Sequence, residues 1–408
     1  MSKNKKSGIT AQKAKAQEIE SRKIFASRIK LFCEALAGPG YFEKISSSAL
    51  AQMHRCRYPT LKAKADPEKN IPKSKVVQYN KLMNKFIEDM PVNLTNGNSV
   101  PMRLYLSEGL LLLNFIRKLP ESDFKKAFEP YFQEEDEDED LIIEMLATLI
   151  HDTNIFLSDL NHSIFNANIG ETSCFDEFAL TNDVLIQEFK PEKSSVCIDG
   201  RNRSIIRVGW VEENMDWLWA DVKPSQLGFN TGESDTPVKL YIQQHALLRM
   251  QERIDITPGI MHYMIFILFK YSEITYHKNE DHSLVAFKLS DEKVGYLLVT
   301  LNDHKLIIQT FLFLTNDGTP EGKKLKHLLE ISRMDKEHLM IDRLPTFNSY
   351  HFDKDEKLSQ MFKDADCGSL LNLGHLQKFS MNEVKDKDPE SILKYLSDAA
   401  YFKNSIKP

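Results

Sequence analysis

The sequence predicts an α+β fold with a helical N-terminal region, a strand-rich middle, and a module of two helices followed by an antiparallel meander. Three observations predict it: apolar residues recur at helical spacing in 31–165, short apolar runs and polar turns fill 166–237 up to a linker, and both patterns follow in 238–335. We expect residues 1–30 to form a basic arm and 336–408 a helical extension. A chain of 408 residues should contain two or three packed units.

The composition is that of a folded protein with ordinary chemistry. Hydrophobic residues make up 42% and charged residues 27%, close to globular averages. The net charge of -6 gives no overall attraction to a polyanion, so any nucleic-acid contact must be local. The five cysteines form no C-x-x-C pair, which predicts reduced, mostly buried thiols rather than disulfides or a zinc site. We expect no metal and no cofactor.

No segment of the sequence predicts export or membrane insertion. The lysine-rich N-terminus has no apolar stretch behind it that resembles a secretory signal. The longest apolar run, 260–269, contains His262 and has half of the roughly 20 residues that span a bilayer. We therefore expect a cytoplasmic protein that makes no membrane contact.

Two basic stretches lie near the N-terminus. Residues 1–30 carry nine Lys or Arg against Glu18 and Glu20, which predicts a basic arm leading into a helix. The arm either contacts RNA, a ribosome or an acidic partner, or only keeps the terminus soluble. Residues 54–85 are also basic, with Tyr58 and Tyr79 interleaved and several prolines. A solvated linker is favoured there over a loop that binds single strands.

The region before the strands contains an amphipathic helix at 141–150, preceded by the acidic run 134–140. Negative charge is favourable at the start of a helix, so the run needs no further role. His151-Asp152 resembles the dyad of the HD phosphohydrolases, but no second histidine with ligand spacing precedes it. A metal-dependent hydrolase is therefore the third-ranked hypothesis. Three tryptophans in the strand-rich middle are expected in the core rather than on a stacking surface: Trp210, Trp217 and Trp219.

The module at 238–335 has the most regular pattern. A strand at 238–242 leads into a helix at 244–254, and Thr257-Pro258 supplies the N-cap and first-turn proline of a second, buried helix. Polar turns separate the meander strands expected at 274–277, 283–289, 294–301 and 305–315. The last strand is apolar on both faces and should be central, with Thr310 on the same face as Ile308 and Leu312.

Four polar residues share one face of the helix at 244–254. They are His245, Arg249, Glu252 and Arg253, at relative positions i, i+4, i+7 and i+8. The apolar residues of the helix, Leu247, Met250 and Ile254, should face the core. One imidazole and two guanidiniums are thereby presented together. An ordinary solvated face with surface ion pairs is the alternative interpretation.

The stretch Q-H-A-L-L-R-M-Q-E-R-I, followed by a helix and a meander, resembles an uncharacterised family of small bacterial proteins with the signature H-A-x-x-R-M-x-E-R. That family is allied to the RelE-like and barnase-like toxin ribonucleases. The resemblance spans about residues 238–318. The chain departs from the family in its greater length and in having Ile254-Asp255 where a glycine commonly follows the second arginine.

The resemblance implies metal-independent cleavage of RNA. His245 would act as acid or base near neutral pH, and Arg249 and Arg253 would clamp phosphate. Glu252 would orient an arginine or act as the partner base, and Thr310 would donate to phosphate from the sheet. We therefore expect a toxin-like or defence-associated endoribonuclease that binds RNA and an antitoxin-like or acidic protein. The alternative is a non-catalytic binding or scaffold protein that keeps the fold.

Overall fold

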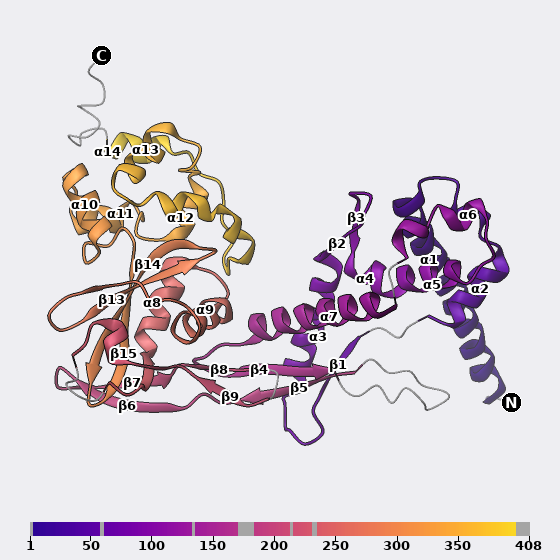
Figure 1. Ribbon diagram of the computed structural model, residues 1–408, viewed down its shortest axis with the longest axis horizontal. Coiled ribbons are helices and arrows are strands. Elements are labelled where there is room, and N and C mark those ends of the chain that lie inside the picture. Colours follow the sequence, from indigo (N-terminus) through magenta and orange to yellow (C-terminus); the bar gives the residue numbers. More distant parts are fainter. Residues whose placement is uncertain are drawn as a thin grey trace, which may run out of the picture. The chain divides into compact units, whose positions relative to one another are not determined.

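The computed structural model describes residues 3–57, 61–132, 135–169, 183–212, 215–230 and 235–396 (Figure 1). It contains both helices and strands, as the predicted α+β class requires. The chain divides into two units, which are described separately. Unit 1 comprises Met1–Asn154 and Ala167–Gln187, and unit 2 comprises Ile155–Asn166 and Glu188–Pro408. Within the described residues, no helix is long and apolar enough to cross a membrane.

Unit 1 is mainly helical. Its helical elements are α1 (Lys3–Ala37), η1 (Phe42–Lys44), α2 (Ser47–Arg55), α3 (Lys73–Asp89), α4 (Met102–Leu104), η2 (Tyr105–Gly109), α5 (Leu110–Arg117), α6 (Asp123–Lys126), η3 (Glu129–Tyr131) and most of α7 (Glu135–Leu157). Its strands are β1 (Lys62–Ala65), β2 (Pro91–Asn93) and β3 (Ser99–Pro101), with parts of β4 (Ile164–Ile169) and β5 (Asp183–Phe189). Strand β1 runs parallel to β5, with Ala63 opposite Val184.

The predicted linker over 54–85 is wrong where α3 forms. Pro72 stands at the N-cap of this helix, where its fixed φ favours helix initiation. Tyr79 is fully buried, and its hydroxyl donates to Asn154 Oδ1 at 2.9 Å. A tyrosine inside the core cannot stack on a nucleic-acid base. Tyr58 lies outside the described residues.

Unit 2 is built on one mixed sheet in the order β12-β13-β14-β15-β11-β7-β6, with β10 beside β11. The strands are β6 (Lys193–Ile198), β7 (Arg201–Arg207), β10 (Asp221–Val222), β11 (Val238–Gln243), β12 (Tyr276–Lys278), β13 (Ser283–Leu289), β14 (Glu292–Asn302) and β15 (Lys305–Phe313). The predicted helix-helix-meander order is confirmed, and β15 is central as predicted. Strands β11 and β15 are parallel, with Leu240 opposite Leu306, and the other pairs are antiparallel.

Strands from both sides of residue 237 share this sheet. Strands β7 and β10 come from the region before it, and both pair with β11. A hairpin of β8 (Gly209–Val211) and β9 (Trp217–Trp219), and the short η4 (Pro224–Leu227), connect them. Periodicity in a sequence identifies strands but not their distant partners, so this continuity could not be predicted.

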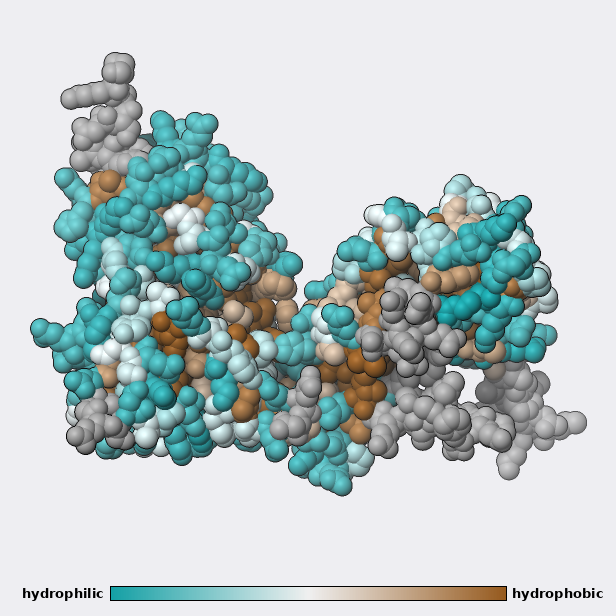
Figure 2. Space-filling model, in the orientation of Figure 1, coloured by the Kyte–Doolittle hydropathy of each residue, from teal (hydrophilic) through white to brown (hydrophobic). Residues whose placement is uncertain are grey.

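Helices pack on the sheet of unit 2, and the helices from the C-terminal part of the chain form a group beside it (Figure 1). Helix α8 (Gln244–Ile254) contacts β15, and α9 (Pro258–Lys270) contacts β13. The C-terminal elements are α10 (Pro320–Leu329), α11 (Arg333–His338), α12 (Leu344–Ser349), α13 (Glu356–Asp364), η5 (Gly368–Phe379) and α14 (Glu390–Leu396). One hydrophobic core joins these helices to the sheet. The visible surface over the C-terminal helices is mostly hydrophilic (Figure 2).

A β-bulge in β15 changes which face of the sheet its side chains lie on, compared with the prediction. Leu298 of β14 lies opposite Thr310 and Val299 lies opposite Ile308, so Gln309 has no partner residue on β14. An extra residue shifts the alternation of side chains by one. Ile308 and Phe311, three residues apart, consequently belong to the same core. The strict alternation predicted for residues 305–315 is therefore wrong beyond the bulge.

Candidate functional site

Helix α8 presents the predicted polar face. It follows β11 directly, and its apolar residues Ala246, Leu247, Met250 and Ile254 are buried in the core. Hydrophobic residues at this spacing fix the orientation of a helix on a sheet, which leaves the opposite face to solvent. His245 and Glu252 are exposed, and Arg249 and Arg253 are partly buried. The four residues thus lie on one helix, but their surroundings differ.

The imidazole of His245 is exposed near the start of α8. Among the described residues, no hydrogen bond or ion pair involves this side chain. A histidine that acts as acid or base usually has one ring nitrogen held by a partner that fixes its tautomer. Nothing in the described part of the chain orients His245 in this way.

Arg249 forms a surface ion pair. Its Nη1 donates to Glu252 Oε2 at 3.0 Å, three residues further along α8. The two side chains are 39% and 59% exposed. Pairs of this kind contribute about 0 to 1 kcal/mol, because water competes for both partners. Arg249 can therefore exchange Glu252 for another anion at little cost.

Arg253 is held much more firmly. Its Nη1 forms an ion pair with Asp342 Oδ2, and both side chains are largely buried, at 16% and 8% exposed. Arg343 also contacts Asp342, from Nε to Oδ1 at 3.3 Å. Burial, followed by the nearby cations of Arg343 and Arg249, lowers the pKa of the Arg253 guanidinium from its usual value. Arg253 therefore anchors α8 to the segment before α12.

Thr310 stands apart from the helix residues. It is partly buried on β15, beside Leu298 and next to the bulge at Gln309. Among the described residues, no hydrogen bond or ion pair connects Thr310 with the four polar residues of α8. The structure thus gathers His245, Arg249, Glu252 and Arg253 on one helix and gives no contact that joins Thr310 to them.

Helix α8 ends where the resembling family commonly has glycine. Asp255 is its C-cap and has a φ of 55°, in the left-handed region that glycine favours. Its buried carboxylate accepts hydrogen bonds from Ser380 Oγ at 2.7 Å and from Asn382 Nδ2 at 2.6 Å. The aspartate therefore has a structural role that glycine could not fill.

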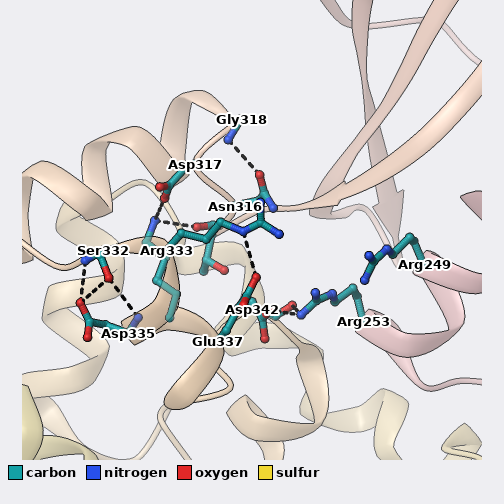
Figure 3. Close-up of polar contacts among 12 residues, drawn as sticks. Arg249, Arg253, Asn316, Asp317, Gly318, Ser332, Arg333, Asp335, Glu337 and Asp342 are labelled. Atoms are coloured by element: carbon teal, nitrogen blue, oxygen red, sulfur yellow. Dashed lines mark hydrogen bonds and ion pairs between the residues drawn. The ribbon is translucent and has the colours of Figure 1, made fainter. Parts of the chain in front are cut away.

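A second group of polar residues, from α11 and the turn after β15, appears with Arg249 and Arg253 in Figure 3. The buried Lys336 donates from Nζ to the backbone oxygen of Thr315 at 2.9 Å and to Asp317 Oδ1 at 2.6 Å. Burial lowers the pKa of this ammonium group, and Asp317 opposes the shift. On the exposed side of α11, Arg333 Nε donates to Glu337 Oε1 at 2.9 Å. These contacts fix the turn at 316–318 against α11.

Local sequence patterns contain no signal for Asp342 and Arg333. Asp342 is 89 residues from Arg253, and Arg333 is further from Arg249 than any helical or strand spacing reaches. Both lie in segments whose patterns predict only turns and short helices. The fold brings Asp342 onto Arg253 of α8, and Arg333 pairs with Glu337 on α11.

The other candidate sites have ordinary structural surroundings. Among the described residues, no group of three His, Cys, Asp or Glu is placed to hold a metal ion, at His151-Asp152 or elsewhere. Trp210 is buried as predicted, whereas Trp217 and Trp219 are partly exposed and stack on each other at 4.6 Å between ring centroids. A surface pocket of about 530 Å³ lies away from the predicted residues and is lined by Tyr350, Lys387, Asp388, Glu390, Ser391 and Lys394.

Comparison with known proteins adds no relative. No family model, no curated protein and no solved structure matches the chain. The resemblance of residues 244–254 to the toxin-related family therefore stays a prediction.

Proposed function

We propose that this protein binds RNA without cleaving it, as a binding protein built on the helix-helix-meander framework. The observation that carries the proposal is the buried ion pair of Arg253 with Asp342. Metal-independent cleavage requires cations that are free to stabilise the phosphorane and an oriented acid and base. Arg253 is occupied by a carboxylate, Glu252 is paired with Arg249, and no described residue orients His245.

The basic helix α1 supports RNA as the partner. Residues 13–20 are all exposed, so this part of α1 is not covered by the other described residues of unit 1. Lys13 and Lys15 project from it, within a stretch of 30 residues that carries nine Lys or Arg against two Glu. Exposed lysines on a helix attract the phosphates of a nucleic acid and release its counterions on binding.

A binding assay with a fluorescent single-stranded RNA and the full chain tests the proposal. We expect binding that weakens with salt and an RNA that stays intact. In Lys13→Gln/Lys15→Gln, the plot of the logarithm of the RNA-binding constant against the logarithm of the salt concentration should be less steep. Its slope should become less negative by about 0.7 for each lost phosphate contact. Lys354→Gln/Lys357→Gln, which removes two exposed lysines from unit 2, should leave the slope unchanged. The absence of binding, or equal effects of both double variants, would refute the proposal.

A metal-independent ribonuclease is the second candidate. It is favoured by the exposure of His245 and by Arg249 one turn further along the same face, whose pair with Glu252 is weak. In that case a substrate phosphate would displace Glu252 and release it as the partner base. RNA cleavage that persists in EDTA and disappears in His245→Ala would establish this candidate.

A further inference from the structure

We infer that Arg249 and Arg333, with the side-chain amide of Asn316, form a binding site for phosphate oxygens beside α8. Because it names RNA phosphate as the ligand, the inference rests on the function proposed above. This site differs from the clamp of Arg249 and Arg253 that the family resemblance implies. Arg253 is paired with Asp342 and does not bind the ligand, and Arg333 takes its place.

Several arginine side chains lie beside α8. In the view of Figure 3, Arg253 extends from α8 toward Asp342, Arg249 extends from the same helix, and the Arg333 guanidinium is drawn beside Asn316. The charges that act on the Arg253 guanidinium include Arg343, Arg249, Glu252 and Glu337, which shows that the groups from α8 and α11 are neighbours. Arg253 and Arg343 share the single carboxylate of Asp342. Within this described cluster, four arginines face three carboxylates, which leaves one positive charge to attract an anion.

Asn316 supplies a neutral donor in a fixed position. Its Oδ1 accepts a hydrogen bond from the backbone N–H of Gly318 at 2.9 Å, which orients the amide. Among the described residues, no acceptor is paired with its Nδ2. Lys336 fixes the turn at 316–318, because its Nζ donates to Asp317 Oδ1 and to the backbone oxygens of Thr315 and Gly322. The amide is therefore preorganised to donate to an oxyanion.

Arg249 and Arg333 are held only by weak pairs at the surface. Arg249 is paired with Glu252 and Arg333 with Glu337, and all four side chains are at least 39% exposed. Surface pairs are weak, whereas a guanidinium binds phosphate through two parallel hydrogen bonds. A phosphate group would therefore replace the two glutamates, while the buried pair of Arg253 and Asp342 stays intact and keeps α8 in place.

Titration calorimetry of the full chain with inorganic phosphate and pyrophosphate tests the site. Arg249→Gln and Arg333→Gln should each weaken binding at least about tenfold, because each removes charge-assisted hydrogen bonds. Glu252→Gln and Glu337→Gln should instead strengthen it about two- to fivefold, since each removes a competing carboxylate. Lys324→Gln breaks an exposed pair with Asp366 in the same unit and should leave binding unchanged.

The outcomes separate the site from the proposed function. Failure of phosphate and pyrophosphate to bind, or equal affinities in Arg333→Gln and Lys324→Gln, would overturn the site. Binding of phosphate with the expected order of variants, but no binding of single-stranded RNA, would establish the site as an oxyanion site and refute RNA as the partner. Weaker RNA binding in Arg249→Gln and Arg333→Gln, at unchanged thermal stability, is the result that supports both.

Discussion

Arg253 of α8 forms an ion pair with Asp342, a residue 89 positions later in the sequence, and both side chains are largely buried. Removing one partner from a buried pair leaves the other charge without compensation. We expect Arg253→Leu to destabilise unit 2 by about 3 kcal/mol, which urea unfolding would measure. Arg343 keeps part of the charge of Asp342 compensated, so the loss should not be larger.

Arg249→Leu is the matched control, since it removes an arginine from the same helix but from an exposed pair. Its cost should be below about 1 kcal/mol. The double variant Arg253→Leu/Asp342→Leu should recover stability relative to Arg253→Leu, because no buried charge remains. Equal losses in Arg249→Leu and Arg253→Leu would show that the Arg253 pair does not anchor α8.

His262 makes the stability of unit 2 dependent on acid. It is buried in α9, and its Nδ1 accepts a hydrogen bond from the backbone N–H of Leu160 at 2.9 Å. Burial lowers its pKa from 6.5 to about 4, which Asp159 partly opposes and His162 supports. The unfolded chain therefore takes up a proton that the folded chain does not. Stability should be full above pH 6.5 and fall toward pH 4, by about 1.4 kcal/mol per pH unit.

His262→Asn should flatten this part of the stability profile, because the Oδ1 of asparagine corresponds to Nδ1, can still accept from Leu160 N–H and does not titrate. The measurement is the midpoint of urea unfolding at several pH values between 4 and 7. His327→Gln changes an exposed histidine and should keep the acid dependence of the parent. If His262→Asn retained the parent's slope, the acid sensitivity would have to come from other groups.

Asp255 combines a left-handed backbone with a buried carboxylate that ties α8 to residues 380–382. Asp255→Gly keeps the backbone conformation and loses the two hydrogen bonds. Asp255→Ala also loses the two hydrogen bonds and in addition places a Cβ at a positive φ, which is unfavourable. The alanine variant should therefore be less stable than the glycine variant by about 1 kcal/mol. Thermal unfolding of the two variants measures the difference. A glycine variant less stable than the alanine variant would contradict the assigned conformation.

Gly259 permits close packing in α9. A Cβ at this position would overlap the backbone oxygen of Ile155, which cannot move as a flexible side chain would. We expect Gly259→Ala to destabilise unit 2 by about 3 kcal/mol, at the upper end for overpacked sites. Gly374→Ala, where a Cβ meets nothing within 4 Å, should be neutral. Comparable thermal stabilities of the two variants would be the contrary result.

Local patterns predicted the elements of the module well. Strand β13 spans 283–289 as expected, because polar turns bracket an apolar run, and α9 starts at Pro258 as expected. Thr257 stands at the N-cap position, but its hydroxyl donates to the backbone oxygen of Phe379 and does not cap the helix. The exposed polar face of α8 was also predicted, since Leu247, Met250 and Ile254 fix the buried side. Helical and strand periods are properties of neighbouring residues, so a single sequence contains them.

Long-range relationships were not predictable. The pairing of β7 with β11, the bulge at Gln309 and the contact of Arg253 with Asp342 depend on segments that meet only after folding. The candidate site changed accordingly. The family resemblance implied that Arg253 clamps phosphate together with Arg249, and the structure pairs its guanidinium with a carboxylate from a distant turn.

The most direct measurement incubates the full chain with single-stranded RNA in EDTA and compares the parent with His245→Ala by gel electrophoresis. Our account predicts that both proteins bind the RNA and leave it intact, because Arg253 is bound to Asp342 and no described residue orients His245. Cleavage by the parent that His245→Ala abolishes would contradict the account.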